Sequence, residues 1–178
     1  RTAIFRSPHR PNATQPLLVI VASERDPGLA TLTLFAPDGS QVTPVQHVLD
    51  GPPYSRWVEV PKPEAGRWTA VFADGDLVRA CQHIGVAKRP GQQLPRASSG
   101  PAWDASRKWE RDTENLYAVF VEQLFREPRG EDVTWPRLQA VIGERERNLL
   151  YDHRSPGEDA RLDLEPDCAD LPYFLSAY

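Results

Sequence analysis

Methionine is absent from this 178-residue chain, and only two cysteines, Cys81 and Cys168, are present. Two cysteines do not make the disulfide framework that stabilises small secreted domains, and the sequence does not decide whether these two are bridged. No apolar run approaches the roughly 20 residues that a membrane-spanning helix needs. Glycine-rich phosphate loops, Gly-x-Ser-x-Gly elbows and His-Glu-x-x-His motifs are also missing. The usual sequence signatures of nucleotide-binding enzymes, α/β-hydrolases and zinc peptidases are therefore absent.

The start of the chain bears on the cellular location of the protein, and its charge distribution bears on the binding of nucleic acid. A chain that begins at Arg1 without methionine is expected to be processed or cut from a longer product, for example by removal of a secretory signal. Residues 1–96 carry 11 Lys and Arg against 8 Asp and Glu, whereas residues 97–178 carry 10 against 17. No cluster of basic residues is visible, so binding to nucleic acid is not expected.

The first part of the chain has the pattern of short antiparallel strands. Apolar and polar residues alternate over 31–35 and 55–61, and residues 16–23 form a compact apolar run that is rich in β-branched residues. Further strands are expected over 67–72 and 77–86, with a turn at Asp74-Gly75-Asp76 between them. The sequence thus predicts a β-sandwich over residues 1–87. Trp57 and Trp68 are expected in its core, with an exposed aromatic pair for gripping a sugar chain as the alternative.

The second part of the chain is predicted to be mainly helical. Residues 88–101 are rich in Pro, Gly, Ser and Gln and read as a linker. A helix is expected from Trp109, with Asp104 or Ser106 as its cap and Pro128 with Gly130 at its end. A second helix is expected from Thr134 to Gly143. The expected fold class is α+β, with an N-terminal antiparallel sandwich followed by a helical segment over 102–178.

The stretch "LFAPDGS … GRWTAVFADG" resembles the small immunoglobulin-like or prepeptidase-like sandwiches that are appended to secreted bacterial enzymes. A second resemblance lies near the end of the chain. The string "DCADL", followed by an apolar helix, resembles the Asp-Cys-Ser-Gly-Leu/Phe motif of NlpC/P60 cysteine peptidases, which have a papain-like fold. This resemblance implies that Cys168 is the nucleophile, at the start of a helix, and that Asp167 precedes it.

A helix start favours the reactive thiolate form of a cysteine, but the neighbouring carboxylates of Asp167 and Asp170 oppose it. Pro172 indicates that the helix begins near Asp170 instead of Asp167. The family's general-base histidine follows the cysteine by many tens of residues, and here only ten residues follow. His153 is the one histidine of the second half and therefore the candidate base within this chain. The alternatives are a buried structural thiol at Cys168 and a solvated loop histidine at His153.

Metal binding is not expected from the remaining candidates, and no cofactor is predicted. Cys81 and His83 lie two apart on a predicted strand and so share a face, but two ligands fall short of a metal site, and core packing is expected for Cys81. A run of carboxylates can supply oxygen ligands for Ca²⁺, although its spacing does not match an EF-hand and a solvated acidic loop is the expected reading. The run comprises Glu158, Asp159, Asp163, Glu165, Asp167 and Asp170.

Two functions from different classes follow. The first is part of a periplasmic or secreted cysteine hydrolase that cleaves amide bonds, with peptidoglycan peptides as substrates, and whose general base lies outside this chain. The chain alone is then expected to be inactive, with the missing C-terminal part of the same product as its partner. The second is a non-catalytic interaction or scaffold protein of the bacterial envelope that binds a protein partner through its β-sandwich.

Overall fold

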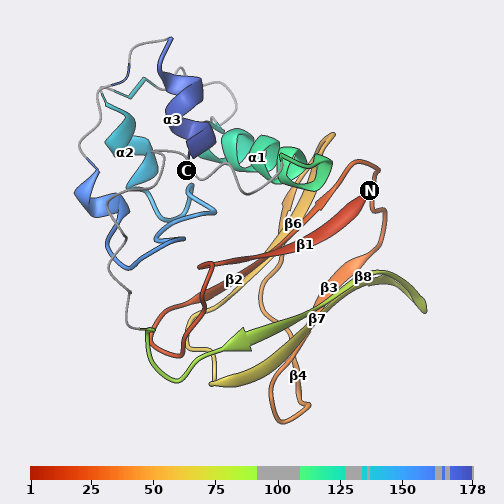
Figure 1. Ribbon diagram of the computed structural model, residues 1–178. Helices are drawn as coiled ribbons and strands as arrows, with labels where there is room; N and C mark the ends of the chain where they lie inside the picture. The colour runs from red at the N-terminus through yellow and green to blue at the C-terminus, as the bar shows by residue number, and fades with distance from the viewer. Residues whose placement is uncertain (92–108, 127–133, 136, 163–165, 167–168, 178) are drawn as a thin grey trace.

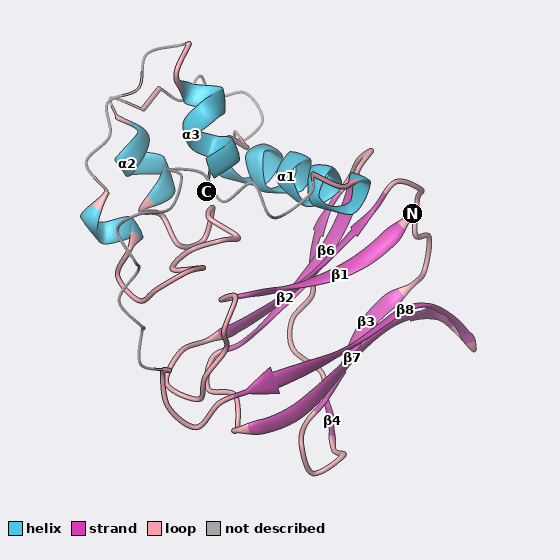
Figure 2. Cartoon of the chain, in the orientation of Figure 1, coloured by secondary structure: helices cyan, strands magenta, loops and turns pink. Residues whose placement is uncertain are grey.

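The computed structural model describes residues 1–91, 109–126, 134–135, 137–162, 166 and 169–177. A β-rich part is followed by short helices, as Figures 1 and 2 show. The elements in chain order are β1 (Thr2–Ser7), β2 (Leu17–Ser23), β3 (Thr31–Phe35), β4 (Gln41–Val42), β5 (His47–Leu49), β6 (Tyr54–Val60), β7 (Gly66–Asp74), β8 (Leu77–Val86), α1 (Arg111–Leu124), α2 (Leu138–Ile142), the 3₁₀ turn η1 (Asp159–Arg161) and α3 (Leu171–Ala177).

The eight strands form two antiparallel sheets of four strands each. Their orders are β1-β2-β6-β5 and β4-β3-β7-β8. Asn12, in the connection between β1 and β2 of one sheet, forms an isolated parallel bridge with Ala87 at the end of β8 of the other sheet. With strands lettered along the chain, these orders are the ABED and C′CFG sheets of the immunoglobulin fold. The first part of the chain is therefore an immunoglobulin-like β-sandwich, as the sequence pattern predicts.

The sandwich core lies between the two sheets. It is built from inward-facing aliphatic residues of β2, β3, β6, β7 and β8, together with Trp68 and Phe72. The Trp68 ring is buried near the start of β7, and its Nε1–H donates a hydrogen bond of 2.9 Å to the carbonyl oxygen of Glu64. A tyrosine hydroxyl makes the same kind of backward contact in many immunoglobulin-like domains. The indole thus fills the core and also fixes the turn before β7.

The outer face of the β1-β2-β6-β5 sheet is also apolar, and α1 covers it. Phe5 and Leu18 pack beside a second buried cluster, in which Ile20, Ala22, Leu49 and Trp57 from the sheet meet Val119 and Leu149. The strand β2 is consequently buried on both faces, which explains why residues 16–23 read as a continuous apolar run and not as an alternation. The described residues from Trp109 onward, called the helical cap below, therefore share a core with the sandwich.

The cap has a third buried cluster of its own. Phe120 and Leu124 of α1 pack with Leu138, Val141 and Ile142 of α2 and with Leu175 of α3. The first helix that the sequence predicts is thus present and has a buried apolar face, although α1 begins at Arg111 instead of Trp109. Glu110 occupies its N-cap position, so the expected cap at Asp104 or Ser106 is wrong.

Other helix boundaries agree in part with the expectation. The helix α2 ends at Ile142 with Gly143 as its C-cap, close to the expected end, but begins at Leu138, four residues after Thr134. The helix α3 begins at Leu171, just after Asp170, as Pro172 requires. Pro128, Gly130 and residues 92–101 of the expected linker lie outside the described residues. The division of the chain at residues 87 and 101 stays a prediction.

Two expectations for the sandwich need correction. Trp57 and Trp68 are both buried, but only Trp68 lies between the sheets, because the side chain of Trp57 points to the cap. Cys81 is an exposed free thiol, so its expected core packing is wrong. Its strand, β8, lies at the edge of the second sheet, with Cys81 on the outward side.

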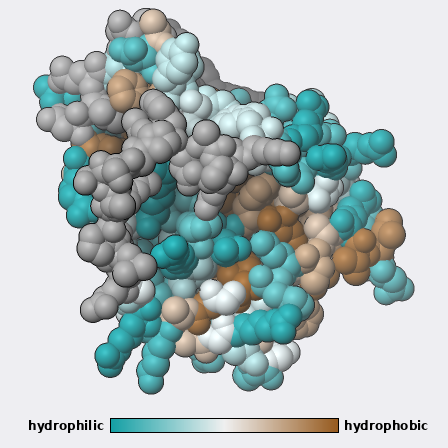
Figure 3. Space-filling view, in the orientation of Figure 1, coloured by the Kyte–Doolittle hydropathy of each residue, from teal (hydrophilic) through white to brown (hydrophobic). Residues whose placement is uncertain are grey.

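The tip of the hairpin that β7 and β8 form is apolar. Leu77 and Val78 at the start of β8 are exposed, and Figure 3 shows apolar surface where this hairpin projects.

If the cap is held by the shared core, shortening Val119 should destabilise the protein. Its side chain is fully buried between α1 and the sheet, so Val119→Ala is expected to lower the free energy of unfolding by about 2 kcal/mol. Hydrogen exchange in α1 should accelerate at the same time. Val48→Ala, at a half-exposed position of β5, is the matched control and should change stability by less than about 0.5 kcal/mol. Equal effects of the two substitutions in urea unfolding would contradict a shared core.

Candidate functional site

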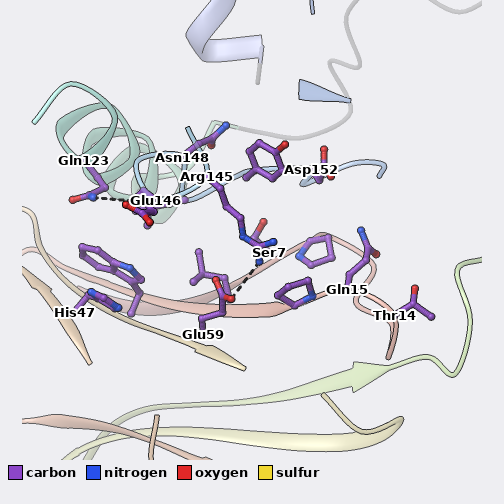
Figure 4. A pocket seen from close by; sticks show the side chains of 16 residues that line it. Ser7, Thr14, Gln15, His47, Glu59, Gln123, Arg145, Glu146, Asn148 and Asp152 are labelled. Atoms are coloured by element: carbon purple, nitrogen blue, oxygen red, sulfur yellow. Dashed lines mark hydrogen bonds and ion pairs between the residues drawn. The ribbon is translucent and has the colours of Figure 1, made fainter. Parts of the chain in front are cut away.

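A groove of about 500 Å³ opens where the cap leaves the outer face of the β1-β2-β6-β5 sheet (Figure 4). Its floor is the sheet, one wall is the 8–16 connection between β1 and β2, and the other wall is the turn region that follows α2, joined by Gln123 of α1. The residues that line it are Ser7, Pro8, Thr14, Gln15, Pro16, Leu18, His47, Trp57, Glu59, Gln123, Arg145, Glu146, Asn148, Leu149, Tyr151 and Asp152.

Strand register explains the chemistry of the floor. One cross-strand row runs Phe5, Ile20, Trp57 and His47, and it lies largely beneath the cap. The next row, toward the end of β6, runs Ser7, Leu18 and Glu59. The row with Trp57 is apolar, and the row with Glu59 carries a carboxylate. The area that the cap covers therefore ends between these two rows. At this edge the imidazole of His47 stacks on the indole of Trp57, with ring centroids 5.3 Å apart.

An ion pair crosses the groove. Arg145 Nη2 lies 3.3 Å from Glu59 Oε1, and both side chains are well exposed. Figure 4 shows the arginine reaching from the wall down to the glutamate on the floor. On the α1 side, Gln123 Nε2 donates a hydrogen bond of 3.3 Å to the carbonyl oxygen of Glu146. These two contacts join the turn region after α2 to the sheet and to α1.

Carboxylates of residues 158–159 hold the loop that forms the far wall of the groove. Asp152 has a φ of 53°, in the left-handed region that aspartate tolerates better than most residues. Its backbone N–H donates a hydrogen bond of 2.5 Å to Asp159 Oδ2, and the carboxylate of Glu158 accepts from the backbone N–H groups of Arg154 and Ser155. The acids of residues 158–159 therefore hold the turn that presents Asp152 to the groove.

Burial raises the pKa of Asp159 to about 6, and the negative charges of Glu158 and Asp152 act in the same direction. The hydrogen bond from the backbone of Asp152 opposes this increase. Because the side chain is buried and its Oδ1 has no hydrogen-bond partner among the described residues, ionisation costs free energy in the folded state. A solvated acidic loop, the expectation from sequence, is therefore wrong for Asp159.

A second ionic contact holds the start of α1 on the sandwich. Arg111 Nε donates a hydrogen bond of 2.7 Å to Glu24 Oε1, and Asn115 Nδ2 donates one of 3.3 Å to the same oxygen. These donors, Arg111 first, together with the terminal amino group of Arg1, lower the pKa of Glu24 to about 2. The carboxylate of Glu24 is therefore ionised in the folded protein at neutral pH.

The predicted catalytic residues are only partly placed. Cys168 and Asp167 lie outside the described residues, so the proposed pairing of Cys168 with His153 is not tested. His153 is half-buried beside the groove, with its Nδ1 3.1 Å from Ser7 Oγ, its carbonyl accepting from the backbone of His9 at 2.7 Å, and its ring 5.9 Å from the ring of His9. A solvated loop histidine is therefore wrong. His153 ties the cap to β1 and the connection after it.

The metal candidates have other surroundings. Cys81 and His83 do share an exposed face, and His83 Nδ1 lies 3.0 Å from Thr69 Oγ1. Asp163, Glu165 and Asp167 of the carboxylate run lie outside the described residues. Within the described ranges no three His, Cys, Asp or Glu side chains gather as a metal site. The described helices include none with the length and apolar character to cross a bilayer.

Sequence reasoning missed most of the groove. Glu59, Arg145 and Asp152 are ordinary charged residues far apart in the chain, and only the docking of the cap brings them together. One signal was available in the sequence. Residues 16–23 are apolar on both faces of a strand, and Trp57 and Val58 are adjacent apolar residues that must point to opposite faces. Both features require a cover on the outer face of the sheet.

Comparisons with known proteins identify neither a family nor a function for this chain. No protein-family model and no curated protein matches the chain. Among solved structures, the chain is similar to titin M4, with 14% identity, a TM-score of 0.35 and coverage of 50% of this chain and 94% of that one. It is also similar to the N-terminal Ig1-2 module of the Drosophila receptor protein tyrosine phosphatase DLAR, with 16% identity, a TM-score of 0.34 and coverage of 53% of this chain. The chain spans about half of that module, 52%. The assignment of the fold therefore rests on the strand order.

The raised pKa of Asp159 predicts a pH dependence of stability. A carboxyl group with a pKa of about 6 in the folded state and about 4 in the unfolded state stabilises the fold most at low pH, and this contribution is lost as the pH rises through 6. Relative to Asp159→Asn, which cannot ionise, the wild type should lose roughly 1–2 kcal/mol of unfolding free energy between pH 4 and pH 7.

Urea unfolding at several pH values measures this difference. Asp76→Asn, in the exposed turn before β8, changes the same charge at a solvated position and should give a curve parallel to that of the wild type. If Asp159→Asn also gave a parallel curve, the carboxyl group would not be desolvated in the folded protein.

Proposed function

We propose that the protein is a non-catalytic interaction protein that binds a partner in the groove between the sandwich and its helical cap. The observation that carries this proposal is the composite groove itself. Its walls and floor come from three distant parts of the chain, and charged, amide and aromatic groups converge in it. Concave sites with a few placed polar groups on a rigid scaffold are typical of ligand and partner recognition.

The residues around the groove favour the binding of a partner over catalysis. A Ser–His contact at its margin joins His153 to Ser7. Ser7 is only 3% exposed, so its hydroxyl is not accessible for attack on a substrate. The carboxylates of Glu158 and Asp159 are used within their own loop. The described residues therefore supply acceptors and packing surface, which suit recognition.

The cysteine hydrolase stays a prediction that rests on the "DCADL" motif alone. Its peptidoglycan substrate rests on the same resemblance, and its location in the bacterial envelope rests also on the expected processing at Arg1 and on the sandwich resemblance. The two functions differ in their demands on the protein. A hydrolase depends on the thiol of Cys168, whereas the interaction protein depends on the groove and keeps its function when both cysteines are replaced.

Site-specific cross-linking tests the proposed function. A photoreactive phenylalanine analogue at Thr14, on the exposed rim of the groove, should yield at least five times more adduct with a partner than the same analogue at Leu29, which is 87% exposed on the β2–β3 connection outside the groove. The adduct is identified by mass spectrometry. The purified partner must then bind the wild type and lose affinity when Thr14→Trp narrows the groove. Equal adducts at the two positions would refute the groove as the binding site.

The reactivity of the Cys168 thiol distinguishes the cysteine hydrolase from the interaction protein. Cys81 is an exposed free thiol and would mask the result, so the experiment uses Cys81→Ser as background. For an interaction protein, alkylation of Cys168 by iodoacetamide at pH 6 should be no faster than that of an ordinary thiol with a pKa near 8.5. Rapid alkylation at pH 6, together with amide hydrolysis that Cys168→Ala abolishes, would favour the hydrolase instead.

A further inference from the structure

The geometry points to a basic side chain of a partner protein, a lysine or an arginine, as the group that the groove binds, with Glu59 as its acceptor. This inference rests on the proposed function and adds the chemistry of the partner. It also gives Arg145 a role. The guanidinium of Arg145 occupies the site in the free protein, and the basic side chain of the partner displaces it.

The charges that line the groove favour a cation. Three residues with a carboxylate, Glu59, Glu146 and Asp152, line the groove together with one residue with a guanidinium, Arg145. The amide groups and hydroxyls of the lining add neutral acceptors, and residues 97–178 as a whole carry 10 basic against 17 acidic side chains. A groove with this balance repels an acidic segment and attracts a basic one, which gives both specificity and a faster encounter.

The position of Arg145 shows how a guanidinium is held in the groove. Its Nη2 lies 3.3 Å from Glu59 Oε1, at the open edge of the floor. The side chains are 48% and 39% exposed, so the pair is weak and exchanges readily with solvent or with another cation. Because Glu59 sits on β6 while Arg145 belongs to a turn, the acceptor is the fixed partner and the arginine is the replaceable one.

The floor beside Glu59 suits the stem of a basic side chain. Leu18 is the cross-strand neighbour of Glu59, and the His47–Trp57 ring stack lies in the adjacent row. Lysine and arginine side chains lay their methylene groups on such apolar surface while the charged end reaches a carboxylate. A free small amine would gain less from this floor, so a segment of a partner protein fits the whole groove better.

Fluorescence anisotropy at low ionic strength tests this inference. The probe is a fluorescein-labelled nonapeptide with two arginines among glycine and serine, and its control has citrulline at both positions, which keeps the shape and removes the charge. The wild type should bind the arginine peptide at least tenfold more tightly. Glu59→Gln should weaken that binding at least fivefold. Arg145→Gln should strengthen it severalfold, because it frees Glu59.

The matched control is Glu64→Gln, which removes the same charge from an exposed position outside the groove and should change affinity less than twofold. Equal losses for Glu59→Gln and Glu64→Gln would mean non-specific attraction and would overturn the inference. Equal binding of the citrulline peptide, or weaker binding by Arg145→Gln, would overturn it as well. If cross-linking at Thr14 succeeds while the arginine peptide fails to bind, the groove is an interface for a partner of other chemistry. If both fail, the proposed function fails too.

Discussion

The structure depends on one constraint, which is that the β1-β2-β6-β5 sheet is apolar on both of its faces. The inward face is satisfied by the opposing sheet, as in any immunoglobulin-like sandwich. The outward face carries Ile20, Ala22 and Trp57, and exposure of these side chains to water would cost several kcal/mol. Val119 of α1 and Leu149 cover them, so the helical cap completes the sandwich instead of standing apart from it. The ionic contact of Glu24 with Arg111 and Asn115 fixes the direction in which α1 crosses the sheet.

The groove follows from where this cover ends. Beyond the row that holds Trp57, the sheet carries Glu59, and the chain after α2 passes above it without filling the space. The loop that forms the far wall is held by carboxylates of its own sequence, at the cost of burying Asp159. Such a cost is common where a binding surface has to be kept in one shape. A rigid floor, a wall set by the cap and an ion pair that can open together suit the proposed recognition of a basic segment.

Much of the sandwich could be predicted from the sequence, because alternation and Asp-Gly turns are local signals. The strands at 31–35, 66–74 and 77–86 lie close to the expected ones, whereas β1 and the short β5 carry too little pattern to be recognised. Cys81 looks like a core residue by type, yet the edge position of β8 leaves it exposed. The groove could not be predicted, since the meeting of Glu59 with Arg145 depends on how the cap packs. The residue that carried the enzymatic hypothesis, Cys168, lies outside the described residues, so local sequence remains its whole basis.

The central claim is that the cap and the sandwich share one buried layer in solution. Methyl-selective nuclear Overhauser spectroscopy of the full chain tests it most directly. A shared buried layer predicts cross-peaks between the methyl groups of Val119 and those of Ile20 and Ala22, or the ring protons of Trp57. Val119 cross-peaks confined to residues of the cap, with none to the sheet, would contradict the shared layer and with it the groove.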